Sequence, residues 1–420
     1  MGCMRIWGGR PLEGSLRVQG SKNAALPMIA ASVLHNGKTV LHNCPRIADV
    51  DYMTDILKML GTKAWWEGNT LFLDCSQVFC GRIHKAYAQK MRSSIVLLGA
   101  LVGRFKKAAI AHPGGCVIGP RPIDMHLEVL RVLGTEISEE DGMICAKCRE
   151  LKGASYRYRI RSVGATQQGI LAAVLAKGTT RLLHCSSEPE VQWLIRFLNK
   201  RGADIVWENE EDICIHGVNC LEDVEFEIPP DRIVAGTYLC AGAITRGRVT
   251  LENVILEEIE AFLDVYQKMG GQYEVNSGKL VTDSRRVELA IPYLETEVYP
   301  GFPTDLQSPM MAVLATVPGR SHIRETIFED RFKAAQGLQK MGASIYIEGR
   351  DAWIEGGSPL HGARVQACEL RGGAALVLAG LAAQGETIVE NCEYIERGYE
   401  HICKDLFALG GILERDTGRY

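Results

Sequence analysis

One pattern of apolar and polar positions recurs six times along the chain. Each copy holds a glycine, a short alternating strand, a polar loop, an amphipathic helix and a second glycine before another strand. The copies recur every 66 to 75 residues. The first glycines are Gly37, Gly103, Gly178, Gly247, Gly319 and Gly385, and the second are Gly61, Gly134, Gly202, Gly270, Gly342 and Gly410. The chain is therefore predicted to repeat one supersecondary unit six times.

The first copy shows the elements of this unit. Residues 39–42 alternate as a strand, residues 49–60 have helical spacing, and Gly61 stands where the helix should end. Gly68-Asn69 has the composition of a two-residue hairpin turn, and similar turns recur in later copies. Between copies lies a second helix, apolar on nearly every face, which predicts burial. The unit is thus predicted to be β-α-β-β-α.

The length of the chain, 420 residues, predicts two domains, since one core of that size is unusual. A hinge at Pro229-Pro230 would place units one to three in residues 22–229. Units four to six would then occupy residues 230–420 together with residues 1–21, because a strand near Met4 to Trp7 could supply the pairing that the last copy lacks. The predicted fold class is α/β, with three units in each domain.

Composition narrows the kinds of partner. The net charge of -4 gives no basic excess for nucleic acid or an anionic membrane, and no apolar run approaches the roughly 18 residues of a membrane span. We expect a cytoplasmic protein whose fourteen cysteines are reduced thiols. The Cys145/Cys148 pair lacks two further ligands at zinc-binding spacing, so no metal site is predicted.

Polar residues gather where helices begin. The tips before the buried helices are Lys22-Asn23, Arg92-Ser93, Ser162-Val163-Gly164, Asp231-Arg232, Thr304-Asp305 and Glu369-Leu370-Arg371, and the amphipathic helices of other units begin near Asp49, Glu190, Arg331 and Arg397. Helix capping alone explains the Ser, Asp and Asn residues. It does not explain Lys and Arg, which the helix dipole disfavours there, so these cations predict an anionic ligand in a shared crevice.

The second unit has a longer loop than the others. Gly103 and Gly134 lie 31 residues apart, against 23 to 25 in the other copies, which predicts an insertion of about seven residues within 112–122. This proline-flanked glycine segment holds Cys116 and Arg121, and resembles a lid. A thiol near an arginine suits proton donation or nucleophilic attack. An incidental thiol remains the alternative from the loop alone.

The loop Pro113-Gly114-Gly115-Cys116 to Arg121-Pro122, taken with Ser21-Lys22-Asn23-Ala24-Ala25, resembles the UDP-N-acetylglucosamine enolpyruvyl transferases. Members of this family are 1-carboxyvinyltransferases that commit UDP-N-acetylglucosamine to peptidoglycan synthesis. The resemblance continues in order through residues 162–166, 188–191, 230–233, 303–307, 325–331 and 397–400. It covers essentially the whole chain, and its specificity comes from the co-occurrence of these motifs.

This resemblance implies two inside-out α/β domains that close on a cleft holding the active site. The implied partners are phosphoenolpyruvate and UDP-N-acetylglucosamine, with no cofactor and a monomer or weak oligomer. Cys116 would protonate or capture the phosphoenolpyruvate carbon and react with fosfomycin, and Asp305 would be the base for the sugar hydroxyl. Lys22 and Arg397 would also be catalytic. The implied clamp for phosphoenolpyruvate is Lys22, Arg92, Arg121, Arg331, Arg371 and Arg397. The implied contacts to the UDP-sugar are Asn23, Arg121, Pro122, Ile123, Asp124, Met125, His126, Ser162, Val163 and Gly164. Asp305, Ile327 and Glu369 are further implied substrate-binding residues.

Several observations leave other interpretations open. Without the resemblance, Asp305 is equally a helix N-cap. The chain departs from the family pattern at Ala48, Gln167, Gln168, Val234 and Glu369. These substitutions allow a different acceptor, or an inactive paralogue that binds a UDP-sugar and regulates. A transferase acting on shikimate 3-phosphate would need no lid cysteine, and nucleotide-binding glycine motifs are missing from the sequence.

Overall fold

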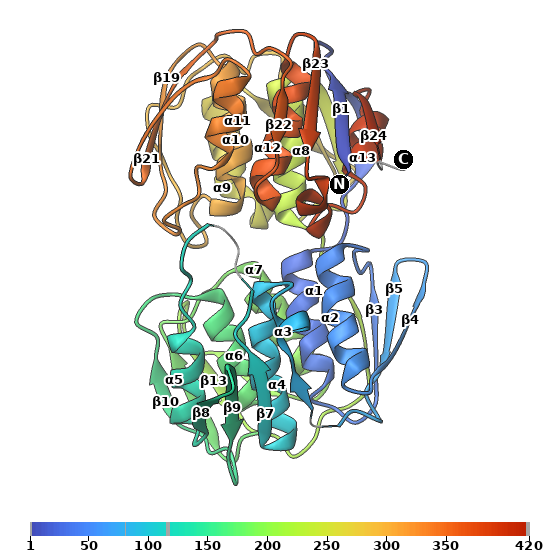
Figure 1. Ribbon diagram of the computed structural model, residues 1–420, viewed down its shortest axis with the longest axis vertical. Helices are drawn as coiled ribbons and strands as arrows, with labels where there is room; N and C mark the ends of the chain where they lie inside the picture. Colours follow the sequence, from blue (N-terminus) through green and yellow to red (C-terminus); the bar gives the residue numbers. More distant parts are fainter. Residues whose placement is uncertain (1, 80, 115–117, 417–420) are drawn as a thin grey trace. The chain divides into compact units, whose positions relative to one another are not determined.

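The computed structural model describes residues 2–79, 81–114 and 118–416, which form two compact units (Figure 1). Within these ranges, unit 1 comprises residues 2–19, 118–120 and 230–416, and unit 2 comprises residues 20–79, 81–114 and 121–229. The chain therefore enters unit 1, builds unit 2 except for residues 118–120, and returns to unit 1. No helix in the described ranges is both long enough and apolar enough to cross a membrane.

Six four-stranded sheets lie in the described part of the chain, three in each unit. All six share one order, in which a parallel edge strand is followed by three antiparallel strands, as the sixfold repeat predicts. The sheets of unit 2 are β14 (Val224–Glu227), β3 (Lys38–His42), β5 (Thr70–Asp74), β4 (Lys63–Glu67); β6 (Arg82–Ile83), β7 (Lys107–Ala111), β9 (Met143–Lys147), β8 (Glu136–Glu140); and β10 (Ser155–Arg157), β11 (Thr179–Leu183), β13 (Ile213–His216), β12 (Asp204–Trp207).

The sheets of unit 1 use both ends of the chain. They are β2 (Glu13–Arg17), β15 (Arg248–Glu252), β17 (Lys279–Asp283), β16 (Gln272–Asn276); β18 (Leu294–Glu295), β19 (Gly319–Arg324), β21 (Asp351–Gly356), β20 (Ser344–Glu348); and β22 (Arg364–Gln366), β23 (Glu386–Glu390), β1 (Cys3–Trp7), β24 (Ile412–Asp416). Strand β1 lies between β23 and β24 and pairs antiparallel with both. It supplies the pairing that the last repeat lacks, as the repeat count predicts.

Helices fill the centre of each unit and the sheets lie outside them. In unit 1, helices α8 (Arg232–Ile244), α10 (Gln307–Thr316) and α12 (Leu370–Ala382) pack against one another, side by side in Figure 1. Their counterparts in unit 2 are α1 (Lys22–Ser32), α4 (Val96–Phe105) and α6 (Val163–Ala173). These six helices are apolar on nearly all faces because every face meets another helix or a sheet. The arrangement confirms the predicted inside-out α/β fold.

The amphipathic helices bury one face in this core. They are α2 (Ala48–Met59), α5 (Asp124–Val132), α7 (Pro189–Lys200), α9 (Glu260–Lys268), α11 (Ala334–Lys340) and α13 (Ile402–Ala408), with a short α3 (Lys85–Ala88). All six second glycines follow the ends of these helices with φ between +91° and +100°, a conformation that glycine adopts without strain.

The second copy of the repeat differs from the sequence prediction in one respect. Gly103 lies inside α4, not before a strand, and Lys106, with φ +60°, takes the left-handed position ahead of β7. Part of the extra length that the glycine spacing assigned to the cysteine loop therefore belongs to the end of α4. The inserted segment is shorter than the predicted seven residues.

Candidate active site

In unit 1, the carboxylate of Asp305 lies between two arginine side chains. Asp305 belongs to the short 3-10 helix η3 (Thr304–Leu306), just before α10. Its Oδ1 accepts a hydrogen bond from Nη2 of Arg331 at 2.7 Å, and its Oδ2 accepts from Nε and Nη2 of Arg371 at 3.3 and 3.2 Å. Neither η3 nor α10 has a side-chain cap, so the helix-cap interpretation of Asp305 is wrong. Asp305 is a ligand of two guanidinium groups.

Both arginines are buried, which makes their ionic partners energetically important. Arg331 is 2% exposed and Arg371 is 1% exposed. A buried guanidinium is tolerated only when it is paired and hydrogen-bonded. Burial lowers the pKa of Arg371, whereas Tyr399 and Asp305 raise it, and the result is a pKa above the ordinary arginine value. Arg371 therefore stays charged beside Asp305.

Glu369 closes this cluster from the start of α12. Its carboxylate is the helix N-cap and accepts hydrogen bonds from the backbone N–H groups of Arg371, at 2.9 Å, and Gly372. One of its oxygens also lies 3.7 Å from Nη1 of Arg331. The longer side chain at this departure from the family pattern thus fixes both the helix that bears Arg371 and the arginine opposite it.

A second buried carboxylate shapes the loop that leads to Arg331. Glu325, 1% exposed, accepts from the hydroxyl of Thr304 at 2.9 Å and from the backbone N–H groups of Ile327 and Phe328 at 2.9 and 3.0 Å. These bonds tie the residue before Asp305 to the loop of the predicted contact Ile327. The motif at residues 325–331 includes Glu325 but predicts no role for it, because the sequence does not distinguish a buried carboxylate from an exposed one.

Two predicted arginines do not sit where the sequence placed them. Arg331 precedes α11 by three residues, and Arg397 ends the 3-10 helix η4 (Cys392–Arg397), five residues before α13. Neither lies in the first turn of an amphipathic helix, so the expectation drawn from the helix dipole is wrong for both. The segment η4 packs against α12, the helix that bears Arg371.

In unit 2, the first residue of α1 pairs with the first turn of α2. Nζ of Lys22 lies 3.4 Å from Oδ2 of Asp49, and their side chains are only 13% and 4% exposed. Ser21 caps α1 by accepting from the N–H of Ala24, and Asn23, the next predicted contact, is half-buried. The predicted cation and the predicted carboxylate at two different helix starts therefore meet.

Three other predicted residues of unit 2 form an electropositive group. Burial, with repulsion from Arg121, lowers the pKa of Arg92 to about 10. Burial, with both arginines, lowers the pKa of His126 to about 3, against a smaller opposing effect of Asp124. The imidazole is therefore neutral at ordinary pH. Its Nδ1 is buried and has no hydrogen-bond partner among the described residues.

The start of α6 approaches this imidazole closely. A Cβ added to Gly164 would lie 2.8 Å from Nε2 of His126, so only glycine permits the contact. Ser162 caps α6 by accepting from the N–H of Ala165, and Val163 is its first residue. The predicted tip at 162–164 and His126 are thus adjacent.

The remaining predicted contacts lie at the start of α5. Ile123 precedes the helix, Asp124 begins it and accepts from the N–H of Met125, and Met125 is buried. Pro122 is exposed, and Asp124 also pairs with Arg159. Arg121 has a positive φ of 46° at the end of the cysteine loop.

Cys116 itself lies outside the described residues. On its N-terminal side, a Cβ on Gly114 would meet the carbonyl oxygen of Gln89 at 1.8 Å, so the chain there requires glycine. On its C-terminal side, the carbonyl of Ile118 accepts from the N–H of Asp330 at 3.1 Å. The segments that flank the thiol are therefore fixed by packing.

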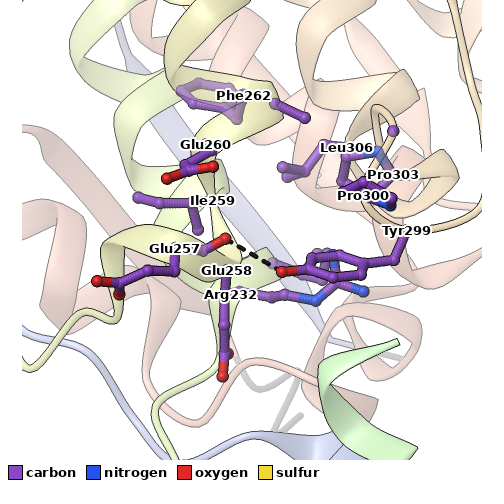
Figure 2. Close-up of a pocket in the computed structure, with 13 residues that line it drawn as sticks. Arg232, Glu257, Glu258, Ile259, Glu260, Phe262, Tyr299, Pro300, Pro303 and Leu306 are labelled. Carbon is purple, nitrogen blue, oxygen red and sulfur yellow. Dashed lines mark hydrogen bonds between the residues drawn. The ribbon is translucent and has the colours of Figure 1, made fainter. Parts of the chain in front are cut away.

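Unit 1 also contains a small pocket, drawn in Figure 2, that is lined by Arg232 of a predicted helix tip but by none of the residues implied to bind substrate. The hydroxyl of Tyr299 donates to the carbonyl of Glu257 at 3.3 Å, and Arg232 lies 5.8 Å from the centroid of the tyrosine ring. The volume of the pocket, ≈ 20 Å³, accommodates about one water molecule. It is too small for either implied substrate.

The departures from the family pattern fall mostly in helix packing. Oε1 of Gln168, in α6, accepts from the N–H of Gly99 in α4 at 3.3 Å, and Val234 is fully buried in α8. Gln167 is also buried, and Ala48 begins α2. Gln168 and Val234 therefore act on the core, whereas Glu369 alone lies in the Asp305 cluster.

The fold of six such units is that of the enolpyruvyl transferases. The chain belongs to the family described as EPSP synthase (3-phosphoshikimate 1-carboxyvinyltransferase), whose model matches residues 6–406. Solved structures share the fold: the enolpyruvyl transferase NikO from Streptomyces tendae has a TM-score of 0.90 at 24% identity, covering 100% of this chain and 99% of that one. EPSP synthase from Acinetobacter baumannii has a TM-score of 0.74 at 18% identity, covering 99% and 100%.

Among relatives by sequence, a more specific name recurs. A protein of Caldanaerobacter subterraneus named UDP-N-acetylglucosamine 1-carboxyvinyltransferase 2 is 44% identical, over 99% of this chain and 100% of its own length. One of Bacillus subtilis with the same name is 38% identical, over 98% and 96%. One of Deinococcus deserti, named UDP-N-acetylglucosamine 1-carboxyvinyltransferase, is 41% identical, over 98% and 97%. These relatives confirm the predicted resemblance, and the chain is a carboxyvinyltransferase.

Proposed function

We propose that this chain transfers the enolpyruvyl group of phosphoenolpyruvate to the 3′-hydroxyl of UDP-N-acetylglucosamine and releases phosphate. This would be the first committed step of peptidoglycan synthesis, taking place in the cytoplasm. The main support is that relatives named for this acceptor match the chain over nearly its full length. No cofactor takes part in the proposed reaction.

The cations suit the charge of the donor. Phosphoenolpyruvate has a phosphate and a carboxylate, and arginine forks match the geometry of both anions. We assign this role to Lys22, Arg92, Arg121, Arg331, Arg371 and Arg397. Because unit 2 contributes the first three and unit 1 the others, the proposal requires both units to act on one substrate pair. Fixed cations would also stabilise charge that develops during addition.

The reaction is an addition followed by an elimination. The sugar oxygen bonds to C2 of the enol phosphate while its proton passes to Asp305, and the Cys116 thiol gives a proton to C3, which becomes a methyl group. In the second step a methyl proton returns to the Cys116 thiolate, the double bond forms again, and the C2–O bond to phosphate breaks. The proton on Asp305 leaves with the phosphate, so the enzyme is restored.

The bonds of Asp305 bear on its strength as a base. Two guanidinium groups on its oxygens stabilise the carboxylate and weaken its proton affinity. An arriving phosphoenolpyruvate anion would compete for the same guanidinium groups and withdraw part of that stabilisation. We therefore propose that Asp305 becomes an effective base only when the donor is bound.

Phosphate release tests the proposal. The parent protein should release phosphate when it is given phosphoenolpyruvate and UDP-N-acetylglucosamine. Cys116→Ser should release phosphate at least about a hundredfold more slowly, which is the usual effect of removing a general acid. Cys220→Ser is the matched control, because Cys220 is an exposed thiol of the same unit. We expect the control to retain the parent rate.

The same assay separates the other candidate functions. Phosphate release with shikimate 3-phosphate, but not with the UDP-sugar, would identify shikimate 3-phosphate as the acceptor. No release with either acceptor, with the UDP-sugar still bound, would instead identify an inactive regulatory paralogue. We also assign to Cys116 the reaction with fosfomycin that the resemblance implies.

A further inference from the structure

Arg371 has one nitrogen that the described residues leave without a partner. Its Nε and Nη2 bind Asp305, whereas Nη1 is buried and makes no hydrogen bond within the described ranges. A buried donor of a charged group is costly when it stays unsatisfied. This nitrogen is therefore suited to an anion that arrives with the substrate.

The side chain that fixes this guanidinium is Tyr399. The ring of Tyr399 is 1% exposed, and the guanidinium carbon of Arg371 lies 5.4 Å from its centroid. Burial raises the pKa of the Tyr399 phenol, against a smaller lowering by Arg371, so the phenol keeps its proton. The ring therefore packs against the buried cation.

The hydrogen bonds around Tyr399 run in one direction. The hydroxyl of Thr237 donates its single proton to the carbonyl of Ile233, one turn earlier in α8, at 2.8 Å. The 2.8 Å bond between Thr237 and Tyr399 must then use the proton of Tyr399. The phenol oxygen consequently directs only lone pairs to its other neighbours, as suits a neighbouring cation.

We propose that Tyr399, oriented by Thr237, is a positioning residue that holds Arg371 against Asp305 with Nη1 turned to the donor anion. The proposal rests on the function proposed above. It links α8, the segment after η4, and α12 into one support for the arginine, so loss of the phenol proton or of its acceptor should release the guanidinium.

The test compares hydroxyl deletions that preserve size. Tyr399→Phe keeps the ring and removes the hydroxyl, and Thr237→Val keeps the volume and removes the acceptor. We expect each to raise the KM for phosphoenolpyruvate and lower kcat/KM for it by about tenfold, the size of a lost hydrogen bond to a charged site. The KM for UDP-N-acetylglucosamine should change less than about twofold, since Arg371 is assigned to the donor. Thr237→Ser should keep the parent kinetics.

Tyr266→Phe is the matched control. Tyr266 is another tyrosine of unit 1 that is 1% exposed, and its hydroxyl lies 2.7 Å from that of Ser284. Loss of the Tyr266 hydroxyl should lower the free energy of unfolding about as much as loss of the Tyr399 hydroxyl, and it should leave the kinetics unchanged. Equal kinetics in Tyr399→Phe and Tyr266→Phe, or equal losses in Thr237→Ser and Thr237→Val, would overturn the proposal.

A second measurement does not depend on turnover. A crystal structure of Tyr399→Phe should show Nη2 of Arg371 outside hydrogen-bond reach of Asp305, compared with 3.2 Å here. An unmoved Arg371 would refute the positioning role whatever the acceptor. Failure of the parent to use UDP-N-acetylglucosamine would instead refute the proposed function and leave this structural comparison valid.

Discussion

His126 shows how surroundings decide the charge of a single residue. Its imidazole is enclosed by protein and faces Arg92 and Arg121, and these two causes hold its pKa at about 3. In the unfolded chain the same group has a pKa near 6.5. Only the unfolded state therefore binds this proton between those two values, so the native state loses stability as the pH falls from about 6.5 towards 3.

We expect His126→Gln to remove this part of the acid sensitivity. Each pH unit below about 6.5 should cost the parent about 1.4 kcal/mol through His126, and the variant should lack that slope. Urea unfolding between pH 7 and pH 4.5 measures the difference. His216→Gln, which changes an exposed imidazole of the same unit, should keep the parent slope, and parallel slopes for His126→Gln and the parent would contradict the assignment.

For single residues, the sequence indicates which residue types matter better than it indicates which side chains they contact. The motif around Asp305 marked the residue, but its letter allowed a helix cap as readily as a base. The deciding contacts come from Arg331 and Arg371, which lie 26 and 66 residues away. The pairing of Lys22 with Asp49 was likewise unforeseen, because it depends on how two helices pack.

Helix ends are where the repeat is most regular. The glycine after each amphipathic helix adopts a positive φ, which lets the chain reverse into the next strand. In unit 2, Gly134 has φ +97°, and a Cβ there would meet only the carbonyl oxygen of Glu150, at 3.5 Å. Backbone conformation, and not space, therefore requires glycine.

Gly134→Ala should accordingly destabilise unit 2 by about 1 kcal/mol. The loss would arise from strain at positive φ, since the methyl group has room. Gly134→Asn should cost less, because asparagine tolerates such conformations better than other side chains. Denaturant midpoints of the two variants provide the comparison, and a larger loss for Asn than for Ala would exclude this explanation.

Helix existence was predictable from periodicity, whereas helix starts were less so. Arg331 and Arg397 were placed at first turns by counting from repeat glycines, yet each is followed by loop residues before its helix begins. The repeat period does not show how many loop residues separate each arginine from the start of its helix. In the second copy of the repeat, Lys106 and not Gly103 directly precedes the strand β7, so counting from the glycine shifted the phase.

On the scale of the whole molecule, the chain interrupts unit 1 to build unit 2. The first strands, β1 and β2, join sheets whose other strands come after residue 230. The sixfold count predicted the completing role of β1, because the last copy lacks one strand of its own. Which residues border each unit required three-dimensional contacts.

Ile6→Ala should weaken unit 1 and spare unit 2. Ile6 is fully buried in β1, and such a truncation typically costs about 2–4 kcal/mol. Hydrogen exchange should quicken in β23 and β24 and stay unchanged in α1 and α4. Arg5→Ala is the control, because the Arg5 side chain is 42% exposed in its ion pair with Glu386. Its effect should stay below about 1 kcal/mol, and faster exchange throughout unit 2 would count against separate stabilities.

The place of β1 between β23 and β24 also bears on how the protein is made. A ribosome releases β1 before every strand of unit 2 and releases β23 and β24 after them, so the apolar side chains of β1 stay uncovered while unit 2 is made. The strands of unit 2, by contrast, have all emerged before β23 and can assemble while synthesis continues. A nascent chain that stalls after unit 2 has emerged would hold one folded unit and an exposed apolar β1 segment. Such an intermediate is prone to aggregation and needs a chaperone.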